Sequence, residues 1–197
     1  MVNEFRIRDS AVRTAREEVL ALVTERRLSW EDLHARLEPG EISVVQEMPP
    51  SLNWYPVATY DRFVTTLMDV EGGGSSEYLV ERGKKAVESL TAPGLELRIE
   101  EASLNRESAD PWWARVGPAL VTLPSAIYSD SNWLLVPGDD RGRFTLEVTD
   151  ASGLPESLRH SVQGVLECLA TRLVGALVRV TSGRPSLDRV VFRGSPA

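Results

Sequence analysis

Residues 132–193 read NWLLVPGDDRGRFTLEVTDASGLPESLRHSVQGVLECLATRLVGALVRVTSGRPSLDRVVFR. Within the segment 143–149, every second residue from Phe144 to Val148 is apolar, the pattern of a strand with one face on a core and one face in water. The apolar segment 132–136 predicts another strand before it, across a turn rich in Gly and Asp. The stretch therefore begins with two strands.

The same stretch then predicts a helix and a β-hairpin. Residues 157–174 carry an apolar stripe at helical spacing, and Gly175 marks the end of the helix. The segments 177–181 and 187–193 have strand character and flank a turn at 182–186. The stripe on the helix consists of Leu158, Val162, Val165, Leu166, Leu169 and Leu173. The C-terminal half thus predicts the order strand, strand, helix, strand, strand.

Helical periodicity dominates the residues that precede this stretch. The expected helices cover residues 9–30, 30–37, 57–71, 77–90 and 111–128, the last of them kinked by internal prolines. Residues 41–56 are expected to form an extended connection, because Pro49, Pro50 and Pro56 disfavour helix in the residues before them. Residues 95–104 fit either a strand or a helix.

Together these patterns predict an α+β fold. We expect a helical N-terminal half, followed by β-β-α-β-β with a small antiparallel sheet packed on helices. Ser29 is expected to cap the second helix and Pro39-Gly40 to close it. Residues 1–40 are expected to form an N-terminal helical arm, and residues 41–197 a single globular α+β domain of ligand-binding or scaffold type.

The composition restricts the classes of function. The 197 residues carry a net charge of -7, which disfavours nucleic acid, because binding to phosphates depends on Lys and Arg. The first residues lack the apolar run of an export signal, and no apolar run approaches the roughly 20 residues that cross a bilayer. We therefore expect a cytoplasmic protein that has no transmembrane segment and does not bind nucleic acid.

Few residues suggest catalysis or metal binding. His34 and His160 lie on separate predicted helices, so they form no local metal pair. Cys168, the one cysteine, excludes an internal disulfide, and its place beside an apolar stripe favours packing over reactivity. The sequence shows no nucleophile elbow, kinase signature or dinucleotide fingerprint. We expect no enzyme activity, no metal and no cofactor.

Aromatic residues are the better candidates for a binding site. Trp54, Trp112, Trp113 and Trp133 lie near the ends of predicted elements, where a ring can line a pocket or an interface, and packing in the core is the competing interpretation. With Cys168 they form the candidate set of residues that bind a ligand or a partner.

The order of the elements in residues 132–193 resembles the fold of haem nitric-oxide-binding domains, vinyl-reductase-type domains and TRAPP vesicle-tethering subunits. Residues 161–169 (SVQGVLECL) and 175–180 (GALVRV) look like the helix-then-strand segment of these domains. Residues 54–56 (WYP) and Arg82-Gly83 are also similar to a large group of uncharacterised myxobacterial paralogues.

The resemblance implies a regulatory or scaffold module that acts by protein–protein interaction, in a small-GTPase or signalling assembly and as a homodimer. The alternative is a sensor domain that binds a small hydrophobic ligand between sheet and helices. The Tyr-x-Ser-x-Arg signature of haem nitric-oxide sensors is absent, and the cysteine cluster of vinyl-reductase-type domains is reduced to Cys168. Neither haem nor metal is therefore expected.

Overall fold

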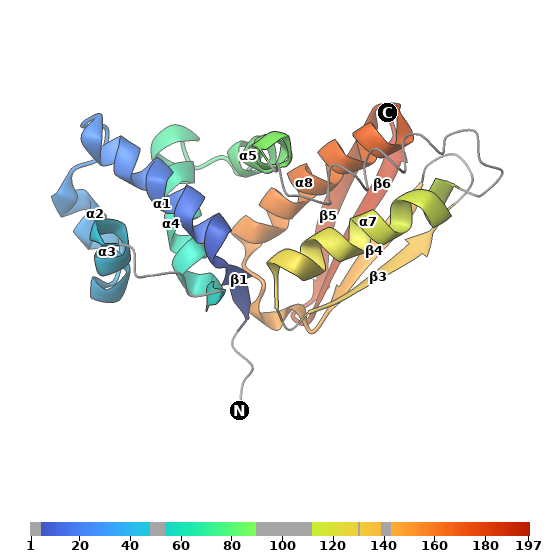
Figure 1. The fold of residues 1–197 in the computed structure, drawn as a ribbon, viewed down its shortest axis with the longest axis horizontal. Helices are drawn as coiled ribbons and strands as arrows, with labels where there is room; N and C mark the ends of the chain where they lie inside the picture. The colour runs from blue at the N-terminus through green and yellow to red at the C-terminus, as the bar shows by residue number, and fades with distance from the viewer. Residues whose placement is uncertain (1–4, 48–53, 90–111, 130, 139–142) are drawn as a thin grey trace.

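The computed structural model describes residues 5–47, 54–89, 112–129, 131–138 and 143–197. They form an α+β fold, in which a small antiparallel sheet packs against helices, as the sequence predicted (Figure 1). Residues 95–104, for which the sequence left strand and helix open, lie outside the described residues.

The C-terminal half has the predicted order of elements. The sheet consists of β3 (Asn132–Pro137), β4 (Phe144–Thr149), β5 (Val178–Ser186) and β6 (Arg189–Pro196). Its strands are antiparallel in the order β3-β4-β6-β5, and α8 (Glu156–Val174) leads from β4 to β5 after a 3-10 turn at Ala151–Gly153. Gly175 ends α8 with a positive φ of 75°, which glycine adopts without steric cost.

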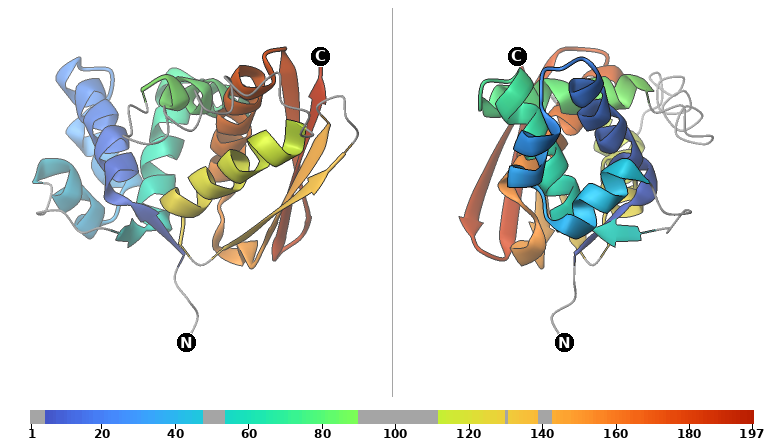
Figure 2. Two further views of the ribbon diagram at one scale, coloured as in Figure 1. Left: turned by 45° about the vertical axis from the view of Figure 1, so that its right-hand side comes forward. Right: turned by 90° about the vertical axis from the view of Figure 1, so that its left-hand side faces the viewer.

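One face of the sheet carries the core. Leu146 of β4 is paired with Leu135 of β3 and with Phe192 of β6, and this row faces the helices. The stripe predicted for α8 is buried there, including Leu158 and Leu166. Figure 2 shows α7 (Trp112–Ile127) and α8 on the same face of the sheet, which leaves the opposite face without a covering helix among the described elements.

The N-terminal half is helical around one short β-ribbon. Its helices are α1 (Asp9–Thr24), α2 (Trp30–Arg36), α3 (Pro39–Gln46), α4 (Val57–Glu71) and α5 (Ser76–Ser89). The ribbon pairs β1 (Arg6–Arg8) with β2 (Trp54–Pro56), two strands that the sequence analysis missed because each has three residues. Ser29 caps α2 as predicted: its Oγ accepts from the Asp32 amide at 3.0 Å.

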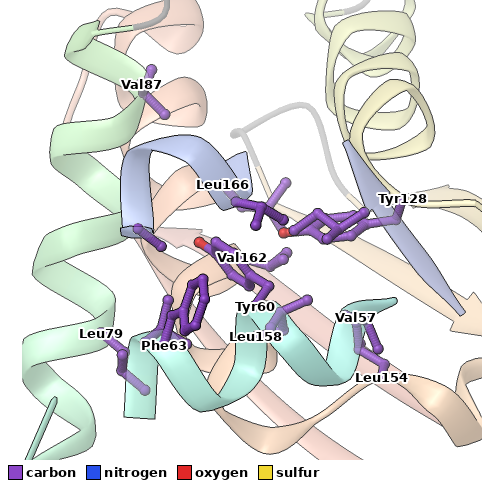
Figure 3. Packing of buried hydrophobic residues seen from close by; sticks show 14 of the residues in the cluster. Val57, Tyr60, Phe63, Leu79, Val87, Tyr128, Leu154, Leu158, Val162 and Leu166 are labelled. Carbon is purple, nitrogen blue, oxygen red and sulfur yellow. The ribbon is translucent and has the colours of Figure 1, made fainter. Parts of the chain in front are cut away.

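The buried residues form a cluster that spans both halves. Phe63 of α4, Tyr128 after α7 and Leu166 of α8 belong to it, and Figure 3 shows how α4 side chains pack against those of α8. The division at residue 40 into an arm and a domain stays a prediction, although Val12 and Val19 of α1 are part of the same cluster.

Two expectations for the N-terminal half are wrong. The extended connection over 41–56 contains α3, and Pro39-Gly40 begins that helix instead of closing the one before it. Proline suits the first turn of a helix, where its missing N–H has no partner to lose. The Glu38 amide also donates to Glu41 Oε2 at 2.9 Å, which stabilises this helix start.

The first helix ends at Thr24, and not near Trp30 as its periodicity suggested. Arg26 has a φ of 60°, and the amides of Arg26 and Arg27 donate to the carbonyls of Val23 and Leu22. This is the hydrogen-bond pattern of a Schellman cap, which usually has glycine at the left-handed position. Because arginine stands there instead of glycine, the helix end could not be recognised from the residue type.

The C-terminal hairpin is also longer than predicted. Strand β5 continues through the expected turn at 182–186 and contains a register shift between Gly183 and Ser186, so the chain reverses at 187–188. An irregular edge strand tolerates Pro185, which a regular ladder would not. Strand β6 also ends at Pro196, three residues beyond its predicted end, and the remaining boundaries of the sheet and of α8 lie within two residues of the prediction.

Candidate functional site

The predicted site residues come from four different elements of the structure. Trp112 and Trp113 begin α7, but their side chains lie outside the described part of the structure. Trp54 lies on β2 in the N-terminal half, where the Arg8 guanidinium stacks 4.1 Å from the centre of its ring. Contacts of this kind contribute about 0.5–1 kcal/mol at exposed positions. Trp54 thus helps to hold β1 against β2.

Trp133 is a core residue of the sheet. Only 8% of its surface is exposed, and its ring stacks between Tyr128 and Phe192 at centroid distances of 6.2 Å each. Its indole Nε1 donates to Ser131 Oγ at 2.8 Å, so its polar atom is satisfied. Trp133 therefore packs in the core, which was the competing interpretation of the sequence.

Cys168 lies on α8 and is half-buried. It packs against the edge of the core cluster, next to the stripe of buried residues. A thiol in apolar surroundings is less reactive than an exposed one, because burial disfavours the thiolate. Cys168 on α8, Trp54 on β2 and Trp133 on β3 thus come from three separate elements.

The two edges of the four-stranded sheet differ, and this difference defines the candidate site. The outer edge of β5 is closed by side chains of α8. Thr171 Oγ1 accepts from the Val178 amide at 3.1 Å, and Glu167 Oε2 accepts from the Val180 amide at 3.0 Å. In an antiparallel strand, alternate residues direct their backbone groups toward the same edge. These bonds therefore occupy the edge that a further strand would need.

The closure continues along the strand. Arg159 Nη1 donates to the Ser182 carbonyl at 3.2 Å, and Ser182 Oγ donates to Gln163 Oε1 at 2.6 Å. The four helix residues that close β5 are Arg159, Gln163, Glu167 and Thr171. They recur every four residues, so they share one face of α8. This polar row was not predicted, although the four-residue spacing of its members can be read from the sequence.

The other edge of the sheet is β3. No strand in the described residues pairs with Asn132–Pro137 on the side away from β4. Just before β3, Ile7 of β1 forms an isolated antiparallel bridge with Tyr128, and the Ser129 amide donates to the Arg6 carbonyl at 3.0 Å. Strand β1 thus covers the approach to this edge and stops short of β3 itself.

The outer face of β3 is apolar and exposed. Leu134 and Val136 have 60% and 43% of their surface exposed, on the side of the sheet opposite α7 and α8. In the next strand Glu147 is paired in register with Leu134, and its carboxylate binds Arg189 at 2.6 Å. The charge beside Leu134 is therefore balanced within the sheet.

The inner face of β3 is supported by α7. A Cβ atom at Gly117 would lie 2.6 Å from Leu135 Cδ2, so the absence of a side chain lets the helix approach the strand closely. Leu135 and Trp133 point inward, while Leu134 and Val136 point outward. A strand that is apolar on both faces usually lies inside a sheet. Here it lies at an edge.

An ion pair with a largely buried arginine connects helices of the N-terminal half. Arg82 of α5 has an 11% exposed side chain and binds Glu18 of α1 through Nε at 2.8 Å and Nη2 at 2.7 Å. Its Nη1 donates to Tyr60 Oη of α4 at 2.8 Å. Burial by itself lowers the pKa of Arg82, but Tyr60 and Glu18 outweigh it, so the pKa is raised. Arg82 stays charged and joins three helices.

The two histidines lie on different helices and in different surroundings. His160 is half-buried on α8, and burial together with the Arg159 guanidinium lowers its pKa. His34 stacks near Trp30 on α2, at a centroid distance of 6.4 Å. Across the described residues, no group of three or more His, Cys, Asp or Glu side chains is arranged to hold a metal ion.

Comparison with known proteins gives no relative for this chain. No family model matches it, and neither the curated proteins nor the solved structures include one with significant similarity. The resemblance to TRAPP and haem nitric-oxide-binding domains stays an expectation. Within the described part of the chain, no helix combines the length and the apolar character that crossing a membrane requires.

Proposed function

We propose that this chain is a non-catalytic interaction module, which binds protein through the outer face and open edge of β3. The single observation that carries the proposal is the contrast between the two sheet edges. The backbone of β5 is closed by α8 side chains at Val178, Val180 and Ser182, whereas β3 exposes Leu134 and Val136.

An exposed edge strand can accept a further strand. An edge strand presents unpaired N–H and C=O groups, and folded proteins commonly block such edges with charges, prolines or covering elements. Here the described residues block one edge of the sheet and leave an apolar strand at the other. A strand from a partner can add to such an edge, with backbone hydrogen bonds for affinity and side chains for specificity.

The outer face adds apolar contact area to the edge. Burying a side chain the size of leucine or valine stabilises a complex by about 1.5–3 kcal/mol when it leaves water completely. Leu134 and Val136 lie two residues apart on one face and would enter the same interface. Their contribution to such an interface would come from the apolar area that both side chains remove from water.

The more specific expectations stay predictions. A place in a small-GTPase or signalling assembly rests on the resemblance alone. The alternative, a sensor for a small hydrophobic ligand, gains no support from Trp133, because its ring already packs between Tyr128 and Phe192. A cytoplasmic location and the absence of catalysis likewise rest on the sequence.

The test compares two exposed leucines. Leu134 and Leu177 are equally exposed at 60%, but Leu177 lies before β5, at the far side of the sheet. Immobilised wild-type protein, L134K and L177K are incubated with a lysate of the producing cells, and the retained proteins are quantified by mass spectrometry. The best candidate is then purified and titrated against all three by calorimetry.

We expect one protein to be retained by the wild type and by L177K and to be lost with L134K, with at least a tenfold weaker affinity in the titration. A tenfold loss corresponds to about 1.4 kcal/mol, close to the lower end of the range for one buried leucine. Two results together would show that β3 is not the binding surface. L134K would bind every retained protein as tightly as L177K does, and the two variants would self-associate to the same extent.

A further inference from the structure

We infer that the occupant of the β3 edge is a second copy of this chain, paired antiparallel with β3 about a two-fold axis. This inference rests on the proposed function, because it names the partner for the same surface. Three observations support it: the neutral side chains of β3, the self-complementary pattern of that strand and the number of open edges in the sheet.

Charge favours contact through β3. The chain carries a net charge of -7, so two copies repel each other unless their contact avoids acidic surface. The six residues of β3, Asn132 to Pro137, include no charged side chain. In the neighbouring strand, the Glu147 carboxylate is bound to Arg189 at 2.6 Å. The edge is therefore a neutral strip on an acidic molecule.

The pattern of β3 is self-complementary. In an antiparallel pair centred on Leu135, Leu134 of one copy lies opposite Val136 of the other, and the same contact occurs twice. Directly opposed residues have Cβ atoms about 4.5–5.5 Å apart, so these four apolar side chains would form one cluster on the outer face. A centre at Leu134 would instead place the two copies of Leu134 opposite each other.

The number of open edges limits the assembly. Thr171, Glu167 and Arg159 close the β5 edge, so each copy offers a single edge in its described sheet. A pair made through that edge has none left to extend, and a sheet of four strands from each copy would be closed at two copies. A second open edge would have produced chains of molecules.

Light scattering coupled to size exclusion tests the inference on the full chain. The monomer has a mass of 21.8 kDa, and we expect the wild type and L177K to approach twice that mass as concentration rises. L134K should stay monomeric, because the contact would have to bury two lysine charges among apolar side chains. Circular dichroism spectra and melting temperatures that agree between the two variants establish that both are folded.

Engineered cysteines test the register. Cys168 is the one cysteine in the chain, so C168S supplies a background without native thiols. In that background, an equimolar mixture of L134C and V136C should form a mixed disulfide under mild oxidation if the pair is centred on Leu135. L134C alone should cross-link if the centre is Leu134. L177C serves as the control and should remain monomeric on a non-reducing gel.

The outcomes separate this inference from the proposed function. A wild type that stays monomeric at its highest soluble concentration overturns the dimer. Cross-linking by L177C as fast as by the faster of L134C alone and the mixture of L134C and V136C also overturns it. If a different protein is still retained by the wild type and lost with L134K, the interaction module stands with another partner. If L134K changes neither self-association nor retention, both proposals fail.

Discussion

Gly83 of α5 and Gly164 of α8 lie where these two helices cross, and neither position has room for a side chain. A Cβ atom at Gly83 would lie 2.0 Å from the Ser161 carbonyl oxygen, and one at Gly164 would lie 1.9 Å from the Val80 carbonyl oxygen. The helix backbones are therefore in direct contact. This crossing joins the N-terminal helices to the helix that supports the sheet.

The first prediction concerns this crossing. G83A and G164A should each lower the free energy of unfolding by about 3 kcal/mol or more, because the methyl group meets backbone that cannot rotate away. Urea denaturation followed by circular dichroism measures the change. G40A is the matched control: a Cβ atom there has no neighbour within 4 Å, and the substitution should be neutral or slightly stabilising. Equal stability of G83A and G40A would contradict the close approach.

The second prediction concerns the closed edge of β5. T171V keeps the shape of the side chain but removes the hydroxyl that binds the Val178 amide and carbonyl at 3.1 and 3.3 Å. We expect a loss of about 1–2 kcal/mol, since two backbone groups lose their partner. Light scattering should also show species larger than the dimer, because an edge has been opened.

Thr24 provides the control for that substitution. Its Oγ1 donates to the Leu20 carbonyl at 2.9 Å within the same helix and at the surface. T24V should change the unfolding free energy by at most about 0.5 kcal/mol and leave the assembly state unaltered. If T171V behaves like T24V in both measurements, the α8 side chains do not protect the sheet edge.

The third prediction contrasts two tyrosine hydroxyls. The Tyr55 hydroxyl is buried and has no hydrogen-bond partner among the described residues, and burial raises its pKa. Y55F removes an unsatisfied polar atom, so it should raise the unfolding free energy by about 1 kcal/mol. The Tyr78 hydroxyl donates to Glu71 Oε2 at 2.5 Å, and Y78F should lower stability by about 1–2 kcal/mol. Chemical denaturation of both variants distinguishes the signs.

The fourth prediction concerns pH and His160. Burial, together with the Arg159 guanidinium 3.0 Å from Nε2, lowers the pKa of His160 from the ordinary value of 6.5. The unfolded chain then binds a proton at a higher pH than the folded chain does, so stability falls as the pH drops below about 6.5 and stops falling below the folded pKa. The neutral ring accepts from Arg159, and a protonated ring would repel it.

H160Q tests this dependence because glutamine retains an acceptor and does not titrate. Melting temperatures are measured from pH 7.5 down to pH 5 for both proteins. The wild type should lose more stability than H160Q between about pH 6.5 and 5, whereas the carboxylates that titrate below this range affect both alike. Parallel curves would show that His160 is not perturbed.

Much of the secondary structure was predictable because side-chain periodicity reports it directly. The stripe of α8 and the alternation in β4 have periods of 3.6 and 2, and both elements lie within two residues of their predicted positions. The errors in the helix boundaries arose at residues whose type is compatible with more than one local structure. Pro39 is compatible with the end of one helix and the start of the next, and Arg26 occupies a left-handed position that glycine usually marks.

The candidate site was less predictable than the fold. Trp54 and Trp133 were candidates because they lie near the ends of predicted elements, with core packing as the competing interpretation. In the structure, Trp54 stacks with Arg8, and Trp133 stacks with Tyr128 and Phe192. Leu134 and Val136 were not predicted as site residues, since an apolar strand is equally consistent with the centre of a sheet. Their exposure depends on the strand order, which no local pattern contains.

The sequence by itself determined the α+β class, the order of the C-terminal elements and the neutral, apolar character of residues 132–137, because local periodicity and composition depend only on neighbouring residues. The tertiary structure alone decided that β3 and β5 are the two edges, that α8 closes one of them and that Leu134 faces outward. These properties depend on contacts between residues far apart in the chain, such as Leu135 with Leu146 and Leu146 with Phe192.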